Sequence, residues 1–276
     1  MKRLFRGLLR IYEYVVFYTC LLLIGLLCLG WSLPALLFHA TLPRPLGMRV
    51  GRFGIMLVFR FYLKVLGSTG RFHLDLSALD VLKDQPPMII APNHPSLWDV
   101  MMISSRLPNV GCIMKGELIG NLFLGSGSRL AGYIRNESLR RMVMLAVEDL
   151  HRGSHLLLFP EGTRSALHPV NPLKGSIGLI ACRARVPVQT VLIETNSPFL
   201  TKGWPVYRMP RLPLTFRVRL GQRFEAPDST AEFMLQLERY FSDALADAEL
   251  PFNALANPSA SSEPNASAPG ESTALS

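Results

Sequence analysis

The stretch MIIAPNHPSLWD (residues 88–99) joins a short apolar run to a polar cluster, and it decides the fold class of this chain. Other apolar runs of strand length occur at 72–76, 110–114, 155–159, 187–193 and 214–220. Helix-like stretches lie between several of these runs, notably Leu139–Arg152 and Gly175–Arg185. Strands that alternate with helices predict an α/β domain with a largely parallel mixed sheet flanked by helices.

The chain divides into three parts by composition. Residues 1–68 are apolar and basic, and we interpret them as membrane helices: an N-terminal anchor followed by an amphipathic helix. Residues 69–250 form the predicted α/β domain, whose last helix begins near Ser229 because Ser229 and Glu232 match a capping box. Residues 251–276 are rich in Ala, Ser, Pro and Asn without periodicity, which is typical of a disordered tail.

The run Val15–Phe38 contains no charged residue and is long enough to cross a bilayer, which takes about 20 apolar residues. Basic residues precede it, so its N-terminus is predicted to be cytoplasmic. Its length and the internal Pro34 favour an uncleaved anchor over a cleaved signal peptide. One full crossing would place the rest of the chain outside the cytoplasm. If the rest of the chain is instead cytoplasmic, either this helix forms a hairpin without crossing or a second helix also crosses.

The segment Met48–Leu66 is apolar but carries four cations within one arc of roughly 120° on a helix. They are Arg49, Arg52, Arg60 and Lys64. One interpretation is a helix in the membrane interface with its cations toward lipid phosphates. The other is an ordinary amphipathic helix packed on the domain, and the sequence leaves both open.

Composition narrows the class of partner. The net charge of +9 fits nucleic acid, an anionic membrane or a phosphate-bearing ligand. The sequence has no helix-turn-helix, zinc-finger spacing or RNA-binding aromatic signature, so we expect no nucleic-acid partner. Its four cysteines form no Cys-x-x-Cys pair, so neither a disulfide framework nor a metal site is expected, and a reducing compartment is the simplest assumption.

A first polar constellation follows the predicted strand at 88–91. Ligands of open α/β sheets bind beyond the carboxyl ends of the strands. There a neutral His94 can take a proton from an attacking hydroxyl, and Asp99 can fix its tautomer. The alternative is purely structural: Ser96 caps the next helix and Asp99 is its acidic partner.

A second constellation, LLLFPEGTRS (residues 156–165), also comes just past a predicted strand. Arg164 is a candidate clamp for an anion because its guanidinium matches phosphate geometry. Gly162 allows backbone N–H groups to approach a ligand, and Glu161 can orient the arginine or bind hydroxyl groups. The alternative is a polar turn with a surface Arg–Glu pair.

Together these motifs resemble those of the glycerophospholipid acyltransferase family, whose bacterial PlsC-like members include 1-acylglycerol-3-phosphate acyltransferases. Its Asn-His-x-Ser-x-x-Asp motif is matched by Asn93, His94, Ser96 and Asp99, and its Phe-Pro-Glu-Gly-Thr-Arg-Ser motif is matched throughout 159–165. The resemblance covers roughly residues 71–222. It implies that His94 is the catalytic base with Asp99 as its partner. The acceptor site would use the residues Asn93, Ser96, Glu161, Gly162, Thr163 and Arg164.

Two further cations belong to motifs that match less closely. Lys115 lies in Lys115-Gly116-Glu117-Leu118, which is similar to a Lys-x-Glu-Leu element of the family, and it is either a phosphate contact or a solvated surface lysine. Arg135 ends Gly132-Tyr133-Ile134-Arg135, which resembles the second family motif only in part. We include both as candidate acceptor contacts.

The resemblance implies a membrane-associated O-acyltransferase of phospholipid biosynthesis that needs no metal or cofactor. The donor would be acyl-CoA or an acyl carrier protein thioester, the default acceptor 1-acylglycerol-3-phosphate, and the location the bacterial inner membrane with the catalytic domain facing the cytoplasm. Alternatives are another lysolipid or hydroxylated lipid acceptor, a thioester-independent transacylase, or a non-catalytic lipid-binding membrane protein. A serine hydrolase is disfavoured because the chain has no Gly-x-Ser-x-Gly elbow.

Overall fold

One sheet organises the computed structural model, which describes residues 2–166 and 170–246. In these ranges its seven strands run in the order β1-β7-β6-β2-β5-β3-β4. Their bounds are β1 Phe72–Asp75, β2 Ile89–Pro92, β3 Val110–Met114, β4 Ile134–Arg135, β5 His155–Leu157, β6 Val188–Thr195 and β7 Leu214–Phe224. Every pairing is parallel except that of β6 with β7. The predicted largely parallel mixed sheet is therefore confirmed.

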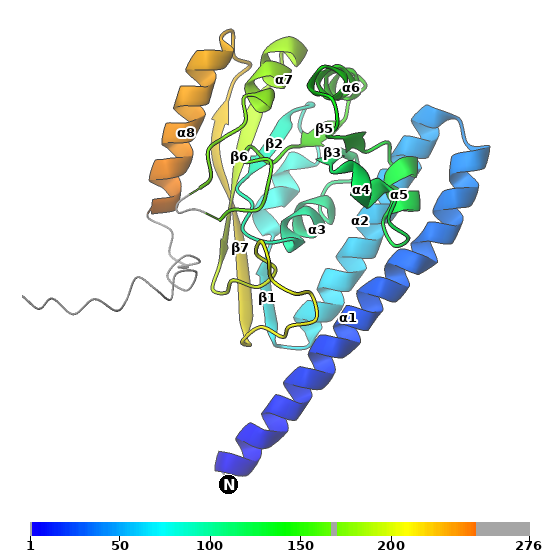
Figure 1. Ribbon diagram of the computed structural model, residues 1–276, viewed down its shortest axis with the longest axis vertical. Helices are drawn as coiled ribbons and strands as arrows, with labels where there is room; N and C mark the ends of the chain where they lie inside the picture. Colours follow the sequence, from blue (N-terminus) through cyan, green and yellow to red (C-terminus); the bar gives the residue numbers. More distant parts are fainter. Residues whose placement is uncertain (1, 167–169, 247–276) are drawn as a thin grey trace, which may run out of the picture.

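Helices cover both faces of the sheet (Figure 1). Successive side chains of a strand point to opposite faces, so Ile89 and Ala91 join one core and Met88 and Ile90 the other. The first core is closed by α6 (Leu139–His151), α7 (Ser176–Ala184) and α8 (Thr230–Ala246). The second is closed by α1 (Lys2–Thr41), α2 (Arg44–Ser68), η1 (Ser77–Leu82) and α3 (Trp98–Ser104).

The predicted elements are present, with small shifts at their ends. All six predicted strands are found, and α8 begins just after Ser229, whose Oγ accepts the Glu232 N–H at 3.4 Å. The strand β4 was missed because two residues carry no periodicity. The short helices α4 (Gly116–Ile119) and α5 (Gly125–Leu130) were not anticipated either. The proposed disordered tail, 251–276, lies outside the described residues.

α1 and α2 form an antiparallel hairpin whose turn lies at residues 42–43, and the hairpin packs along the domain (Figure 1). Phe17 and Cys20 of α1 are buried in the same core as α2 and the sheet. Glycines allow the close approach: a Cβ on Gly54 would lie 2.1 Å from the Trp31 ring, and one on Gly51 would lie 2.5 Å from the Ala131 backbone nitrogen. The hairpin is thus part of the folded domain.

The opposite side of the hairpin is apolar and exposed. By length and composition α1 is a candidate membrane span: an 18-residue stretch between Arg3 and Thr41 has a mean hydropathy of 2.3, and only 17% of that stretch is buried. The loop 122–124 between α4 and α5 continues the surface with Leu122, Phe123 and Leu124. We call this the apolar face; its other exposed members include Leu22, Leu26, Leu29, Leu33, Leu36, Leu37, Phe53, Leu57 and Phe61.

The four cations of the segment Met48–Leu66, which lies within α2, separate into two pairs. Arg52 is 2% exposed and donates to both carboxylate oxygens of Asp149 at 2.8 and 2.9 Å. Arg60 donates to the Ser105 carbonyl at 2.9 Å. For these two the lipid-phosphate interpretation is wrong, because both side chains bind the domain. Arg49 and Lys64 remain exposed.

Candidate active site

The two polar constellations lie at one edge of the sheet because they follow neighbouring strands. β2 and β5 pair in parallel, so their carboxyl ends meet at the same edge. His94 comes two residues after β2, and the loop 158–165 follows β5. Backbone contact joins them directly, since the Ser165 N–H donates to the His94 carbonyl at 2.7 Å.

His94 is held on three sides. Its Nδ1 lies 2.8 Å from Oδ2 of Asp99, and its ring stacks on Phe159 with centroids 3.8 Å apart and an interplanar angle of 21°. Its backbone N–H donates to Glu161 at 2.9 Å. The side chain is 12% exposed, and no partner in the described ranges occupies Nε2. This geometry leaves Nε2 free to accept a proton from a bound hydroxyl.

Asp99 makes the contacts that both interpretations of the sequence require. Its Oδ2 faces His94. The same oxygen accepts the Ser96 N–H at 2.8 Å, which is the contact that the acidic residue of a capping box makes at a helix N-terminus. The carboxyl group is fully buried. Burial raises the pKa of Asp99, against the opposing effect of the hydrogen bonds from His94 and Ser96. An orienting carboxylate and a helix-start contact are therefore compatible in this residue.

Glu161 joins the two constellations. It is 1% exposed, and one oxygen accepts the His94 N–H and the Ser165 hydroxyl, at 2.9 and 2.6 Å. The other oxygen accepts the Asn171 N–H at 3.0 Å. The structure thus ties Glu161 to the protein itself, where the sequence suggested an arginine or an acceptor hydroxyl as its partner. Its position fixes the loop that carries His94.

Asn93 and Ser96 also hold the loop in place. The Asn93 side chain donates to the Ile193 carbonyl at 3.0 Å and accepts the Ile193 N–H at 2.7 Å, which clamps it to β6. Ser96 is fully buried, and its hydroxyl donates to the Phe199 carbonyl at 3.0 Å. Both were candidate acceptor contacts, and their polar side-chain atoms are instead engaged with the backbone. They position His94.

The turn at 159–165 differs from expectation at Gly162 and Arg164. Gly162 adopts a φ of +68°, which favours glycine, but its N–H donates to the Phe159 carbonyl at 3.0 Å. That N–H is therefore used within the turn and is not free to meet a ligand. Nη1 of Arg164 donates to the Leu200 and Thr201 carbonyls, both at 2.8 Å. Thr163 is partly exposed beside it.

Lys115 and Arg135 lie farther along the same edge. They follow β3 and end β4, which pair in parallel with Met114 opposite Arg135. Both side chains are exposed, and Arg135 approaches Glu137 at 3.6 Å. Arg164, in contrast, binds the loop after β6, on the other side of β2 and β5. The three predicted cations are therefore spread along the edge, and no contact joins Arg164 to the other two within the described ranges.

Sequence reasoning missed Phe159 as a functional neighbour, because an aromatic residue at a strand end is usually part of a core. Its stack on His94 is visible only in three dimensions. In residues 2–166 and 170–246 no group of three or more His, Cys, Asp or Glu side chains is placed to hold a metal ion.

Replacing Asp99 with Asn tests the pair directly. We expect kcat to fall roughly 10²-fold, because the amide favours the tautomer with its proton on Nε2 and so blocks the base. The stack on Phe159 should keep the ring in place.

The same variant has a predicted effect on stability. Because burial raises the pKa of Asp99, ionisation of this residue lowers the free energy of unfolding as the pH rises above the pKa of an aspartate in the unfolded chain. The free energy of unfolding of Asp99→Asn, measured at neutral pH, should therefore equal or exceed that of the parent. A clearly lower value would contradict the conclusion that ionised Asp99 destabilises the fold.

Comparisons with known proteins agree with this geometry. An acyltransferase family model, described as "Acyltransferase", matches residues 73–194. A 1-acyl-sn-glycerol-3-phosphate acyltransferase of Pseudomonas aeruginosa is 23% identical over 206 residues, which cover 71% of this chain and 78% of the relative. A lyso-ornithine lipid O-acyltransferase of the same organism is 30% identical over 126 residues, which cover 41% of this chain and 48% of the relative.

A solved structure shares the fold. The crystal structure of the 1-acyl-sn-glycerophosphate (LPA) acyltransferase PlsC from Thermotoga maritima superposes with a TM-score of 0.60 at 22% identity. The match covers 90% of this chain and 97% of the other. The two proteins therefore share a fold over most of both chains.

Proposed function

The chain belongs to the PlsC-like glycerophospholipid acyltransferase family and is an O-acyltransferase, and from this premise we propose that it transfers a fatty acyl group from a thioester to the free hydroxyl of 1-acylglycerol-3-phosphate. The product would be phosphatidic acid. The observation that carries the proposal is the His94–Asp99 pair at the carboxyl edge of the sheet, with Nε2 free to meet a substrate.

The proposed reaction proceeds without a covalent enzyme intermediate. Nε2 of His94 takes the proton of the acceptor hydroxyl while that oxygen attacks the thioester carbonyl carbon. Asp99 stabilises the imidazolium that forms. The tetrahedral intermediate collapses with loss of the carbon–sulfur bond, and the imidazolium returns its proton to the departing thiolate. The donor leaves as a free thiol, and the acceptor gains an ester.

Arg164 is our proposed contact for the acceptor's phosphate. Its Nη1 is fixed by two backbone carbonyls, which orients the guanidinium and leaves its remaining N–H groups for a ligand. A phosphate held there would position the neighbouring glycerol hydroxyl near His94. Lys115 and Arg135 add positive charge along the edge.

A second acceptor is favoured by one observation, the 30% identity to a lyso-ornithine lipid O-acyltransferase. An ornithine-headed lysolipid presents an amino acid where lysophosphatidic acid presents a phosphate. Purified protein in detergent should be given a labelled acyl thioester with each acceptor in turn. The proposal predicts a higher kcat/KM for lysophosphatidic acid, and Arg164→Gln should lower that value selectively. A preference for the ornithine lipid, insensitive to Arg164→Gln, would replace the default acceptor.

The same assay addresses the thioester-independent transacylase. That reaction would move label from a phospholipid donor to lysophosphatidic acid when no thioester is present. Our proposal predicts no such transfer. A non-catalytic lipid-binding protein would give neither reaction while still binding the lysolipid.

We propose that the apolar face inserts into one leaflet while the hairpin stays packed on the domain. The opposite side of α1 is in the protein core, through Phe17 and Cys20, and Glu13 forms an ion pair with Arg71 at the start of the domain. A helix packed in this way lies in the interface and does not need to cross. This arrangement would keep the site on the side of the cytoplasmic N-terminus, in a bacterial inner membrane.

A labelling experiment tests the topology. Cysteine variants at Arg3 and at Lys202 should react with an impermeant thiol reagent from the same side of oriented membrane vesicles. Reaction from opposite sides would show that α1 crosses the bilayer.

A further inference from the structure

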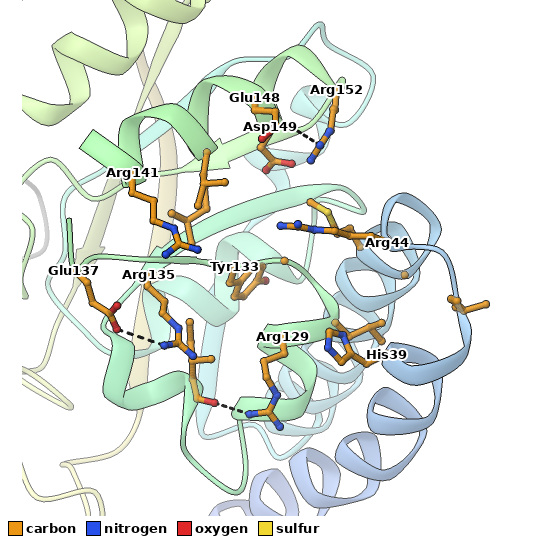
Figure 2. Close-up of a pocket in the computed structure, with 18 of the residues that line it drawn as sticks. His39, Arg44, Arg129, Tyr133, Arg135, Glu137, Arg141, Glu148, Asp149 and Arg152 are labelled. Carbon is orange, nitrogen blue, oxygen red and sulfur yellow. Dashed lines mark hydrogen bonds and ion pairs between the residues drawn. The ribbon is translucent and has the colours of Figure 1, made fainter. Parts of the chain in front are cut away.

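A cleft of about 540 Å³ lies beside the edge strand β4, at a distance from the loops that hold His94. Its walls come from the α1–α2 turn, α5, β4 and α6 (Figure 2). We call it the arginine cleft after the cations that line it, Arg44, Arg129, Arg135, Arg141 and Arg152. Arginines that converge on a concave site provide the chemistry that binds phosphate, because the guanidinium fork matches phosphate oxygens.

The carboxylates of the cleft are already paired. Asp149 is bound by Arg52, which approaches from the interior, and Glu148 forms an ion pair with Arg152. Glu137 lies 3.6 Å from Arg135. These pairs neutralise the negative charge of the lining. The remaining arginines therefore make the electrostatic potential of the cleft positive.

Arg44 and Arg141 are the cations without a protein partner. Neither side chain has a hydrogen bond or an ion pair to the part of the chain that the structure describes. Figure 2 shows that they point into the cleft from α2 and α6, which form facing walls. Arg129 of α5 also lines the cleft, and its side chain donates to the Ile119 carbonyl at 2.9 Å. Two free guanidinium groups on opposite walls are arranged to hold one anionic ligand between them.

The lining of the cleft reaches the carboxyl edge of the sheet, where the candidate active site lies, at Arg135 and Glu137. Arg135 ends β4, and β4 is separated from β2 by three inter-strand spacings, roughly 14 Å. The phosphate of lysophosphatidic acid is only four covalent bonds from the acceptor hydroxyl. It therefore cannot reach this cleft while the hydroxyl is at His94, and the cleft is not the acceptor's phosphate site.

We propose that the arginine cleft binds the nucleotide phosphates of a coenzyme A thioester, an inference that rests on the proposed function and names its donor. The pantetheine arm between sulfur and phosphate is about as long as four extended amino-acid residues, roughly 14 Å. This length matches the separation of β2 and β4. Coenzyme A carries three phosphate groups, whereas a carrier protein presents a single one at the end of the same arm. Several arginines around one cleft therefore fit coenzyme A better than a carrier protein.

The test replaces both free arginines, in Arg44→Gln/Arg141→Gln, and compares three donors: acyl-CoA, an acyl-pantetheine thioester and an acyl carrier protein thioester. With acyl-CoA we expect the donor KM to rise at least about tenfold, since each charge-assisted phosphate contact contributes a factor of that order. With an acyl-pantetheine thioester, which lacks the nucleotide, the variant should match the parent. The acceptor KM should not change. Arg140→Gln is the matched control, because Arg140 is an exposed arginine on α6 outside the lining.

Other results overturn the inference. These are an unchanged KM for acyl-CoA, an equal loss with acyl-pantetheine, or a loss confined to an acyl carrier protein donor. Calorimetric titration of coenzyme A into full-length His94→Ala protein gives a readout without turnover, and the added Arg44→Gln/Arg141→Gln pair should weaken Kd by at least about tenfold. If no donor supports transfer, the proposed function fails, and this titration still decides whether the cleft binds the nucleotide.

Discussion

Replacing His94 with Ala should lower kcat by about 10⁴-fold, at the upper end of what a general base contributes. The loss is large because Nε2 has no substitute: Asp99 is fully buried behind the ring, and Glu161 is committed to backbone and hydroxyl donors. The KM for each substrate should change little, since the imidazole acts mainly in the transition state. Steady-state kinetics with labelled thioester and lysophosphatidic acid measure both parameters.

Ser96→Ala is the control for this variant. Its hydroxyl is buried and bonded to the Phe199 carbonyl, so its removal should cost some stability but leave most of kcat. A larger loss of kcat in Ser96→Ala than in His94→Ala would point instead to a serine nucleophile. Retention of more than about a tenth of kcat in His94→Ala would remove the histidine from the mechanism.

Replacing Arg52 with Met should lower the free energy of unfolding by about 3–5 kcal/mol, the cost of leaving one charge of a buried pair alone. The Arg52 guanidinium uses all of its donors: two bonds reach Asp149, and the others reach the Ala131 carbonyl, Asn109 and Ser154. It therefore fastens α2 to α6 and to the loops between them. Denaturant unfolding in detergent measures the change.

A double-mutant cycle separates the interaction energy of the Arg52–Asp149 pair from the cost of leaving one of the two charges buried alone. Arg52→Met with Asp149→Leu should recover most of the loss, because an apolar pair of similar volume replaces a buried ion pair at little cost. Arg49→Met, an exposed position on the same helix, should stay within about 0.5 kcal/mol of the parent. If Arg52→Met alone has no effect, the network does not anchor the hairpin.

Much of the fold was predictable because the strands of a parallel sheet are short apolar runs bounded by polar loops. The runs around Ile89, Leu156 and Val191 are buried on both faces of the sheet, so their composition alone marks them. The strand β4 could not be found in this way. It is held by pairing with β3 and carries only Ile134 as a buried side chain.

The site was predictable in its motif and less so in its contacts. His94 and Asp99 meet because five residues of loop and helix start return the carboxylate to the ring. Long-range partners are invisible to local patterns: Glu161 reaches His94, and Asn93 reaches Ile193, across the sheet. Helical periodicity placed Arg52 with the other cations of α2, but could not reveal the buried carboxylate of Asp149 that it faces.

The most direct test of the account is a rapid-quench experiment with excess enzyme, labelled acyl thioester and lysophosphatidic acid. Direct attack assisted by His94 predicts that label passes from thioester to phosphatidic acid without appearing on precipitated protein, and that His94→Ala stops the transfer. Label that first accumulates on the protein as an ester and then moves to the lipid, or transfer that persists in His94→Ala, would contradict the mechanism.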